Sequence, residues 1–198
     1  MSTTPDEPRA DHPGADDRGD QILALLERAG EVDYIGEGVS QLVHALQAAD
    51  LARRAAADDE AVLAALLHDV GHLCVGPDAP RMGGVGVMSH EEVGAAYLVR
   101  LGLPQRVTEL VRGHVAAKRY LVSRDPGYLG RLSDASRVTL AHQGGPMSRA
   151  ERHAFESLPH RQDLLRLRSW DERAKDPIRS VPDLATYRTL LRSRLANR

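Results

Sequence analysis

Disulfide chemistry is absent from this sequence of 198 residues, because Cys74 is its single cysteine. One cysteine excludes an internal disulfide framework and is typical of the reducing cytoplasm, where we expect the protein to reside. No apolar run approaches the roughly 18 residues of a membrane-spanning helix. The N-terminus also lacks the charged-then-apolar pattern of a signal peptide. The sequence therefore predicts a protein without a membrane partner.

Aromatic residues and net charge are also scarce. Hydrophobic residues make up 42% of the chain, but aromatic residues only 4%, with one Phe and one Trp. A core built from Leu, Val and Ala favours packed helices. The formal net charge of −2 gives no general attraction to nucleic acid or to an acidic membrane surface.

The chain divides into a polar N-terminal segment and a helical remainder. Residues 1–18 are rich in Pro, Asp and Gly, which predicts a disordered tail that includes a solvated His12. The remaining length favours one domain, residues 19–198. No segment shows convincing strand alternation, so the expected fold class is all-α. Apolar spacing predicts helices over 21–30, 39–57, 58–72, 89–102, 104–119, 132–145, 148–158, 160–175 and 184–196.

Capping residues mark several predicted helix starts. Ser40 lies near the start of the second helix, and either Asp58 or Asp59 suits the third. Ser89 is followed three residues later by Glu92, the spacing of a capping box.

The run LLHDVGH, with His68 and Asp69, is the most informative motif of the chain. On a continuing helix, His68 and His72 are four residues apart and share a face. Asp69 is one step round and can point into the same cleft. A carboxylate has two oxygens and can bind two metals at once, so Asp69 is the candidate bridge of a dinuclear site.

Three further histidines, His44, His90 and His114, fall in other predicted helices. Imidazole and carboxylate groups suit divalent iron, manganese or a similar metal. A cage of four helices with one inward ligand each is a common way to build a dinuclear site. The sequence therefore offers enough ligands for two metals.

The acidic ligand from the helix over 160–175 stays open at this stage. Asp171 is the leading candidate, Glu172 and Asp176 are alternatives, and a surface salt bridge would explain any of them. A lone histidine in an Ala/Leu-rich helix is also more often a hydrogen-bonded core or surface residue than a ligand. The expected structural or exposed histidines are His142, His153 and His160.

Taken together, these motifs resemble the HD-domain superfamily, whose pattern is His…His-Asp…Asp on helices, over roughly residues 35–175. The closer resemblance is to the HD-domain mixed-valent di-iron oxygenases that cleave organophosphonates. It implies an all-α HD-domain helical bundle. The segments that carry it are YIGEGVSQLVHALQAA, LLHDVGH, SHEEVGAAYL, RGHVAAKRYL, LSDASRVTLAHQGGPMS and RSWDERAKDP.

Carried over by position, the resemblance implies two irons in the Fe(II)/Fe(III) state. One would be held by His44, His68, Asp69 and Asp171, and the other by Asp69, His90 and His114. The second iron would keep open positions for a chelating substrate.

The same resemblance implies the substrate contacts. Tyr34 would occupy the open position on the second iron until substrate displaces it, and Glu37 would take a substrate amino or ammonium group. Either Arg161 or Arg168 is a candidate to line the site. The residues that would face the phosphonate are His72, Lys118, Ser136 and Thr139.

The implied activity is O2-dependent cleavage of the C–P bond of a 1-hydroxyalkylphosphonate, with or without an amino or trimethylammonio group. Phosphate and a carboxylic acid would be the products. One alternative is an HD-type metal-dependent phosphohydrolase acting on a nucleotide or another phosphomonoester, which needs neither Tyr34 nor a redox metal. Another is a non-catalytic module that binds a nucleotide.

Overall fold

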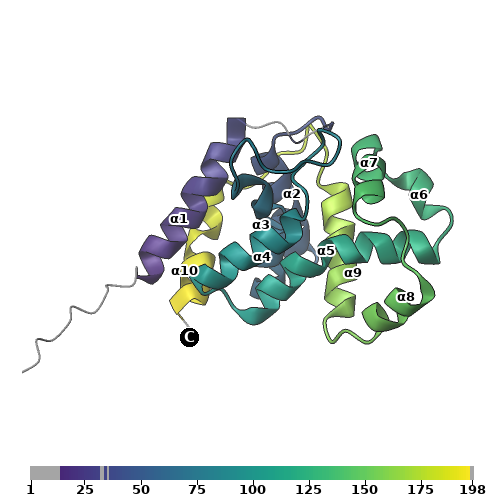
Figure 1. Cartoon of the computed structure of the whole chain (residues 1–198). Coiled ribbons are helices and arrows are strands. Elements are labelled where there is room, and N and C mark those ends of the chain that lie inside the picture. The colour runs from purple at the N-terminus through teal and green to yellow at the C-terminus, as the bar shows by residue number, and fades with distance from the viewer. Residues whose placement is uncertain (1–13, 32–33, 35, 197–198) are drawn as a thin grey trace, which may run out of the picture.

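The computed structural model describes residues 14–31, 34 and 36–196, and among these it contains helices and loops but no strand. An isolated antiparallel bridge joins Arg81 and Val87. The all-α prediction is confirmed (Figure 1). Within the described residues every helix is too short or too polar to cross a bilayer. The predicted tail residue His12 lies outside the described residues.

Most predicted helices are present, with small shifts at their ends. The α-helices are α1 (Ala15–Arg28), α2 (Gln41–Arg54), α3 (Asp59–Leu67), α4 (His90–Leu101), α5 (Gln105–Arg124), α6 (Tyr128–Arg131), α7 (Asp134–His142), α8 (Arg149–Glu156), α9 (Arg161–Arg173) and α10 (Arg188–Ala196). Short 3-10 helices are η1 (Ala29–Glu31), η2 (Val70–Leu73) and η3 (Leu184–Tyr187). The four-residue α6 was not predicted, because one turn is too short to show a helical apolar period.

The boundary of the polar N-terminal segment is wrong at residues 15–18, because α1 already begins at Ala15. The Arg18 guanidinium donates to the carbonyl of Leu101 at 2.7 Å and to that of Leu195 at 3.1 Å. These bonds fix the first turn of α1 against the ends of α4 and α10. Composition could not reveal them, since both partners are distant in sequence.

The helices that carry the candidate metal ligands form the centre of the bundle. The long helix α5 packs against α3, α4 and α9, and α2 packs against α3 and α9. Figure 1 shows α1 beside α10 at one end of this group and α6, α7 and α8 at the other. The core between the helices consists mainly of Leu, Val and Ala, as the composition predicted. Its packing holds five chain segments around one buried point.

The HD motif does not continue one helix. Helix α3 ends at Leu67, His68 is its C-terminal cap, and the chain tightens into η2 after Asp69. His72 therefore lies in η2, and the prediction that it shares an α-helical face with His68 is wrong. The cause is a close approach between Gly71 and α4, since a Cβ on Gly71 would lie 1.9 Å from the carbonyl oxygen of His90.

Two predicted caps are confirmed and one is wrong. The Ser40 side chain accepts from the backbone N–H of Val43, and Asp58 caps α3. Ser89 instead has left-handed backbone angles, with φ at 55°, and makes no side-chain capping bond. Glu92 pairs with Arg112 on α5, so the capping box at α4 does not form.

We predict that Gly71→Ala lowers the free energy of unfolding by about 3 kcal/mol or more, because the added Cβ overlaps the backbone of α4. Urea denaturation of the metal-free protein measures this change. Gly130→Ala is the matched control, since its Cβ would have no neighbour within 4 Å. Its unfolding free energy should change by less than about 1 kcal/mol. Equal stabilities of the two variants would contradict the close approach.

Candidate metal centre and its pocket

Four side chains from α2, α9 and the end of α3 form a first ligand group. His44 and His68 face each other with their Nε2 atoms 3.0 Å apart. The Asp69 Oδ2 atom lies 3.6 Å from Nε2 of His44 and 3.4 Å from Nε2 of His68. The Asp171 Oδ1 atom lies 3.4 Å from Nε2 of His44. All four side chains are largely buried.

A second ligand group uses the other oxygen of Asp69. His90, at the start of α4, and His114, in α5, have their Nε2 atoms 3.1 Å apart. The Asp69 Oδ1 atom lies 3.2 Å from Nε2 of His90 and 3.5 Å from Nε2 of His114. Asp69 thus presents one oxygen to each group, which is the arrangement expected of a bridging carboxylate.

Backbone carbonyls fix how the four imidazoles are oriented. Each ring directs Nδ1 at a carbonyl oxygen, which can only accept, so Nδ1 carries the proton and Nε2 has the lone pair. Burial also lowers the pKa of His68 to about 4, which keeps that ring neutral. The bonds run from His44 to Ala174 at 2.8 Å, from His68 to Ala65 at 2.9 Å, from His90 to Val87 at 3.3 Å and from His114 to Val111 at 2.7 Å.

The donor set fits divalent cations. Two Nε2 lone pairs about 3 Å apart repel each other unless a cation lies between them. A metal with bonds of about 2.1 Å at right angles holds neighbouring ligand atoms about 3.0 Å apart. The spacings of 3.0–3.8 Å between each Nε2 atom and its neighbours in the first group are near this value or somewhat longer. The geometry can therefore hold one metal in each group, with Asp69 shared.

Asp171 is the acidic residue that the structure brings to the cluster, and the alternatives lie elsewhere. Glu172 accepts from Arg168 at 3.2 Å, and the Asp176 carboxylate accepts from the backbone of Ile178. Arg168 also donates to Oδ2 of Asp171 at 2.5 Å, which leaves Oδ1 directed at the histidines. Burial alone would raise the pKa of Asp171, but Arg168 and the nearby imidazoles hold it well below its ordinary value.

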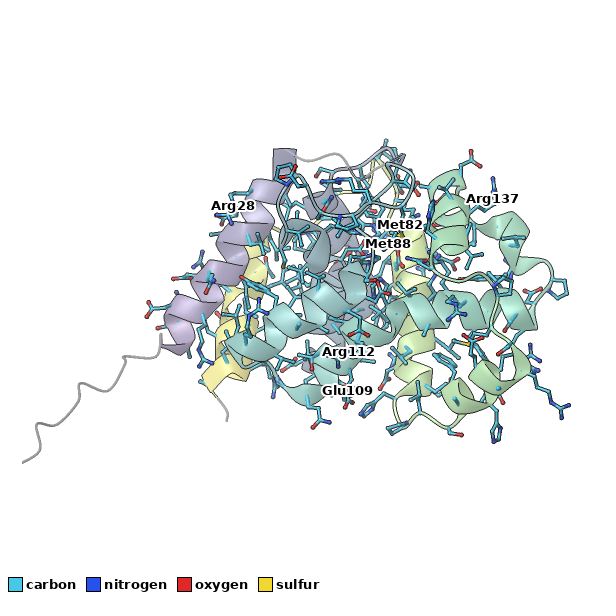
Figure 2. All side chains as sticks on the ribbon, in the orientation of Figure 1. Arg28, Met82, Met88, Glu109, Arg112 and Arg137 are labelled. Carbon is cyan, nitrogen blue, oxygen red and sulfur yellow. The ribbon has the colours of Figure 1, made fainter. Side chains whose placement is uncertain are left out.

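A cavity of about 60 Å³ opens beside the second ligand group. Met82, labelled in Figure 2 in the loop between η2 and α4, is buried and lines this cavity. His72 lines it as well, and burial lowers the pKa of its ring to about 3. The backbone N–H of Val87 donates to Nδ1 of His72 at 3.1 Å, so Nε2 carries the ring proton and can donate to a ligand.

The predicted phosphonate contacts also line this cavity. Lys118 is buried, and its ammonium donates to Oγ1 of Thr139 at 2.9 Å. Ser136 is buried on the same side. Thr139 donates in turn to the carbonyl of Ser136, which is the backbone bond expected of a helical threonine. Burial, reinforced by the nearby Arg168, lowers the pKa of Lys118 to about 7.

Tyr34 and Glu37 reach the cavity from the loop before α2. The Tyr34 ring stacks on His44 with centroids 4.0 Å apart. Burial, followed by the negative charge of Asp69, raises the pKa of Tyr34 well above its ordinary value. Glu37 accepts from Lys175 at 2.5 Å and from Ser133 at 2.6 Å. Its carboxylate therefore already has a cationic partner from the chain itself.

The sequence analysis left one lining residue undecided and missed another. Arg168 rather than Arg161 lines the cavity, since Arg161 instead donates to the carbonyl of Glu156. Lys175 was missed altogether. Its signal is compositional, because Lys118 and Lys175 are the only lysines in the sequence and both line the cavity. The histidines without predicted roles, His142, His153 and His160, lie outside the cluster as expected.

Comparison with known proteins assigns the chain that carries this site to a family. A family model described as HD domain matches residues 42–152, which include all five histidines of the site and Asp69, the candidate bridging residue. The chain belongs to the HD-domain family. Outside the matched range, α9 supplies Asp171 and Arg168 to this HD domain.

Similar proteins extend the likeness to most of the HD-domain chain. Hydroxymethylphosphonate dioxygenase of Gimesia maris is 40% identical over 178 residues, which cover 89% of this chain and 88% of that protein. A [1-hydroxy-2-(trimethylamino)ethyl]phosphonate dioxygenase (glycine-betaine-forming) of Leisingera caerulea is 38% identical over 82% of both chains. An uncharacterised protein of Acanthamoeba polyphaga mimivirus is 41% identical over 86% of this chain and 78% of its own. The resemblance recognised in the sequence motifs is confirmed.

We predict that Asp69→Ala reduces metal binding at both ligand groups, because each group uses one oxygen of this carboxylate. His114→Ala should lose only the metal of the second group. Metal content after anaerobic loading with Fe²⁺ and desalting measures both outcomes. Asp176→Ala is the matched carboxylate control and should load like the wild type. An Asp69→Ala protein that retains full metal content would remove the bridging role.

Proposed function

We propose that this protein is a di-iron, O2-dependent oxygenase that cleaves the C–P bond of a 1-hydroxyalkylphosphonate. The observation that carries the proposal is a pair of ligand groups joined through Asp69 beside a cavity rich in cationic groups. The names of two relatives, both phosphonate dioxygenases that align over most of their length, support it. The products would be inorganic phosphate and a carboxylic acid, with one O2 consumed per bond cleaved.

The proposed iron ligands divide between the two groups. His44, His68 and Asp171 would hold one iron, His90 and His114 the other, and Asp69 would bridge them. When bound, this redox-active pair would activate O2 and oxidise the carbon that carries the substrate hydroxyl. The protein's own contribution is to hold the ligands, place the substrate and limit access of water to the site.

The phosphonate would lie at the cationic side of the cavity. Arg168 supplies permanent positive charge there, and Lys118 supplies a charge that it keeps below about pH 7; both side chains are buried, so their attraction for a dianion is weakly screened. Neutral His72 can donate its Nε2 proton to a phosphonate oxygen, because Nδ1 is held by the backbone of Val87. Ser136 adds a hydroxyl at the same wall. These contacts would leave the C1 hydroxyl directed at the second ligand group.

Tyr34 would guard the metal centre before substrate arrives. Its ring stacks on His44, and burial together with the nearby carboxylates raises the pKa of its phenol and so favours the protonated form. The phenol would cover the open position on the second iron until the entering substrate displaces it. The chain thereby limits oxidation of the centre in the absence of substrate.

The test is phosphate release by protein loaded anaerobically with Fe²⁺, over a panel of 1-hydroxyalkylphosphonates, with and without O2. We expect phosphate only when a hydroxyphosphonate and O2 are both present, with O2 uptake equal to phosphate formed. A phosphonate lacking the C1 hydroxyl is the matched control and should not react. Anaerobic phosphate release from a phosphomonoester, with none from any hydroxyphosphonate in air, would instead establish the phosphohydrolase alternative.

A second prediction concerns Lys118, whose ammonium would bind the phosphonate. Replacement by Met removes a charge-assisted hydrogen bond and should weaken binding about ten- to a hundredfold near pH 6. Because the pKa of Lys118 is about 7, the wild-type side chain loses its charge as the pH rises above that value. The ratio of wild-type to variant affinities should therefore shrink above about pH 7.

Calorimetric titration of the anaerobic protein across this pH range measures the ratio, in which the ionisation of the substrate itself cancels. Arg119→Met is the matched control, because Arg119 pairs with Glu151 outside the cavity. A ratio that stays constant from about pH 6 to 9 would show that Lys118 does not bind the phosphonate through its charge.

A further inference from the structure

The ammonium of Lys175 occupies a complete hydrogen-bonding site within the chain. Its Nζ atom donates to Oε1 of Glu37 at 2.5 Å, to Oγ of Ser133 at 3.1 Å and to Oγ of Ser136 at 3.3 Å. A lysine ammonium has three N–H donors, so these bonds use all of them. Lys175 therefore has no donor left for a phosphonate, unlike Lys118, which among the described residues donates only to Thr139.

The partner carboxylate is the one that would otherwise attract a cationic ligand. Three carboxylates line the cavity within the described residues: Glu37, Asp69 and Asp171. Asp69 and Asp171 face the histidine groups. Glu37 alone is directed elsewhere, and its side chain is only 10% exposed against Lys175 at 14%. Its negative charge is thus neutralised inside the protein.

Lys175 also covers the aromatic ring of the pocket. Its Nζ atom lies 5.7 Å from the centroid of the Tyr34 ring, within the range of a cation–π contact. The same ring stacks on His44. An aromatic face and a carboxylate are the two groups that bind amino and quaternary ammonium ligands most readily. In this pocket one internal ammonium contacts both of them.

We infer that Lys175 sets the charge class of the substrate: the pocket takes 1-hydroxyalkylphosphonates without a cationic group and discriminates against ammonium-bearing ones. The inference rests on the proposed function, and it assigns Glu37 to Lys175 instead of to the substrate amino or ammonium group expected from the resemblance. An ammonium-bearing substrate would have to break the Lys175–Glu37 pair or lie against a like charge. Lys175 acts as a specificity-determining residue through charge and does not contact the reacting atoms.

The test compares binding of hydroxymethylphosphonate and 2-amino-1-hydroxyethylphosphonate to the iron-loaded protein under anaerobic conditions, by calorimetry. The wild-type protein should bind hydroxymethylphosphonate at least tenfold more tightly than 2-amino-1-hydroxyethylphosphonate. Lys175→Met frees Glu37 and should shift the ratio of the two affinities at least tenfold toward the ammonium ligand. Lys175→Arg keeps the positive charge and should retain the wild-type preference.

A double variant isolates the responsible carboxylate. In Lys175→Met/Glu37→Gln neither charge remains, so the shift toward the ammonium ligand should disappear. Iron content of each variant confirms an intact centre. Wild type that binds the ammonium ligand as tightly as hydroxymethylphosphonate overturns the inference and leaves the oxygenase proposal intact. Binding and cleavage of neither phosphonate overturn the proposed function, and the inference with it.

Discussion

The rest of the structure depends on one constraint: the lone pairs of four imidazoles and the two oxygens of one carboxylate are buried close together. Backbone carbonyls fix the Nδ1 protons of His44, His68, His90 and His114, so the Nε2 atoms cannot donate to one another. Buried lone pairs at such distances are stable only with positive charge between them. Asp69 adds one negatively charged oxygen to each pair of histidines, which increases the need for positive charge. The bundle is therefore a frame that holds five segments at a point where only cations satisfy the chemistry.

This frame depends on backbone contacts as much as on side chains. Gly71 and Gly94 allow η2 to touch the start of α4, and a Cβ on either would meet backbone atoms of the other segment. The contact sets the position of His90 relative to Asp69, because Asp69 lies two residues before Gly71 and His90 is the first residue of α4. The loop after η2 then folds back so that Val87 orients His72. Local backbone geometry thus determines which nitrogen each ring presents.

The sequence predicted the helices, the ligand residue types and most of the cavity lining, since these follow from apolar spacing and from residues with specific chemistry. It could not predict the break after Leu67, which depends on the approach of α4 to Gly71. Arg18 anchors α1 through the carbonyls of Leu101 and Leu195, which are distant in sequence, so composition misplaced the start of that helix. Lys175 was missed for the same reason, because its partner Glu37 is 138 residues away.

The rarity of lysine has a consequence for how this protein can be modified. Its 26 basic residues include only Lys118 and Lys175, so arginine carries almost all of the positive surface charge. Arginine stays protonated throughout the physiological range and does not undergo acylation at a primary amine. Acetyl groups, ubiquitin and amine-reactive dyes would find their lysine targets only inside the pocket. Every lysine side-chain modification of this protein would therefore report on, or block, the same site.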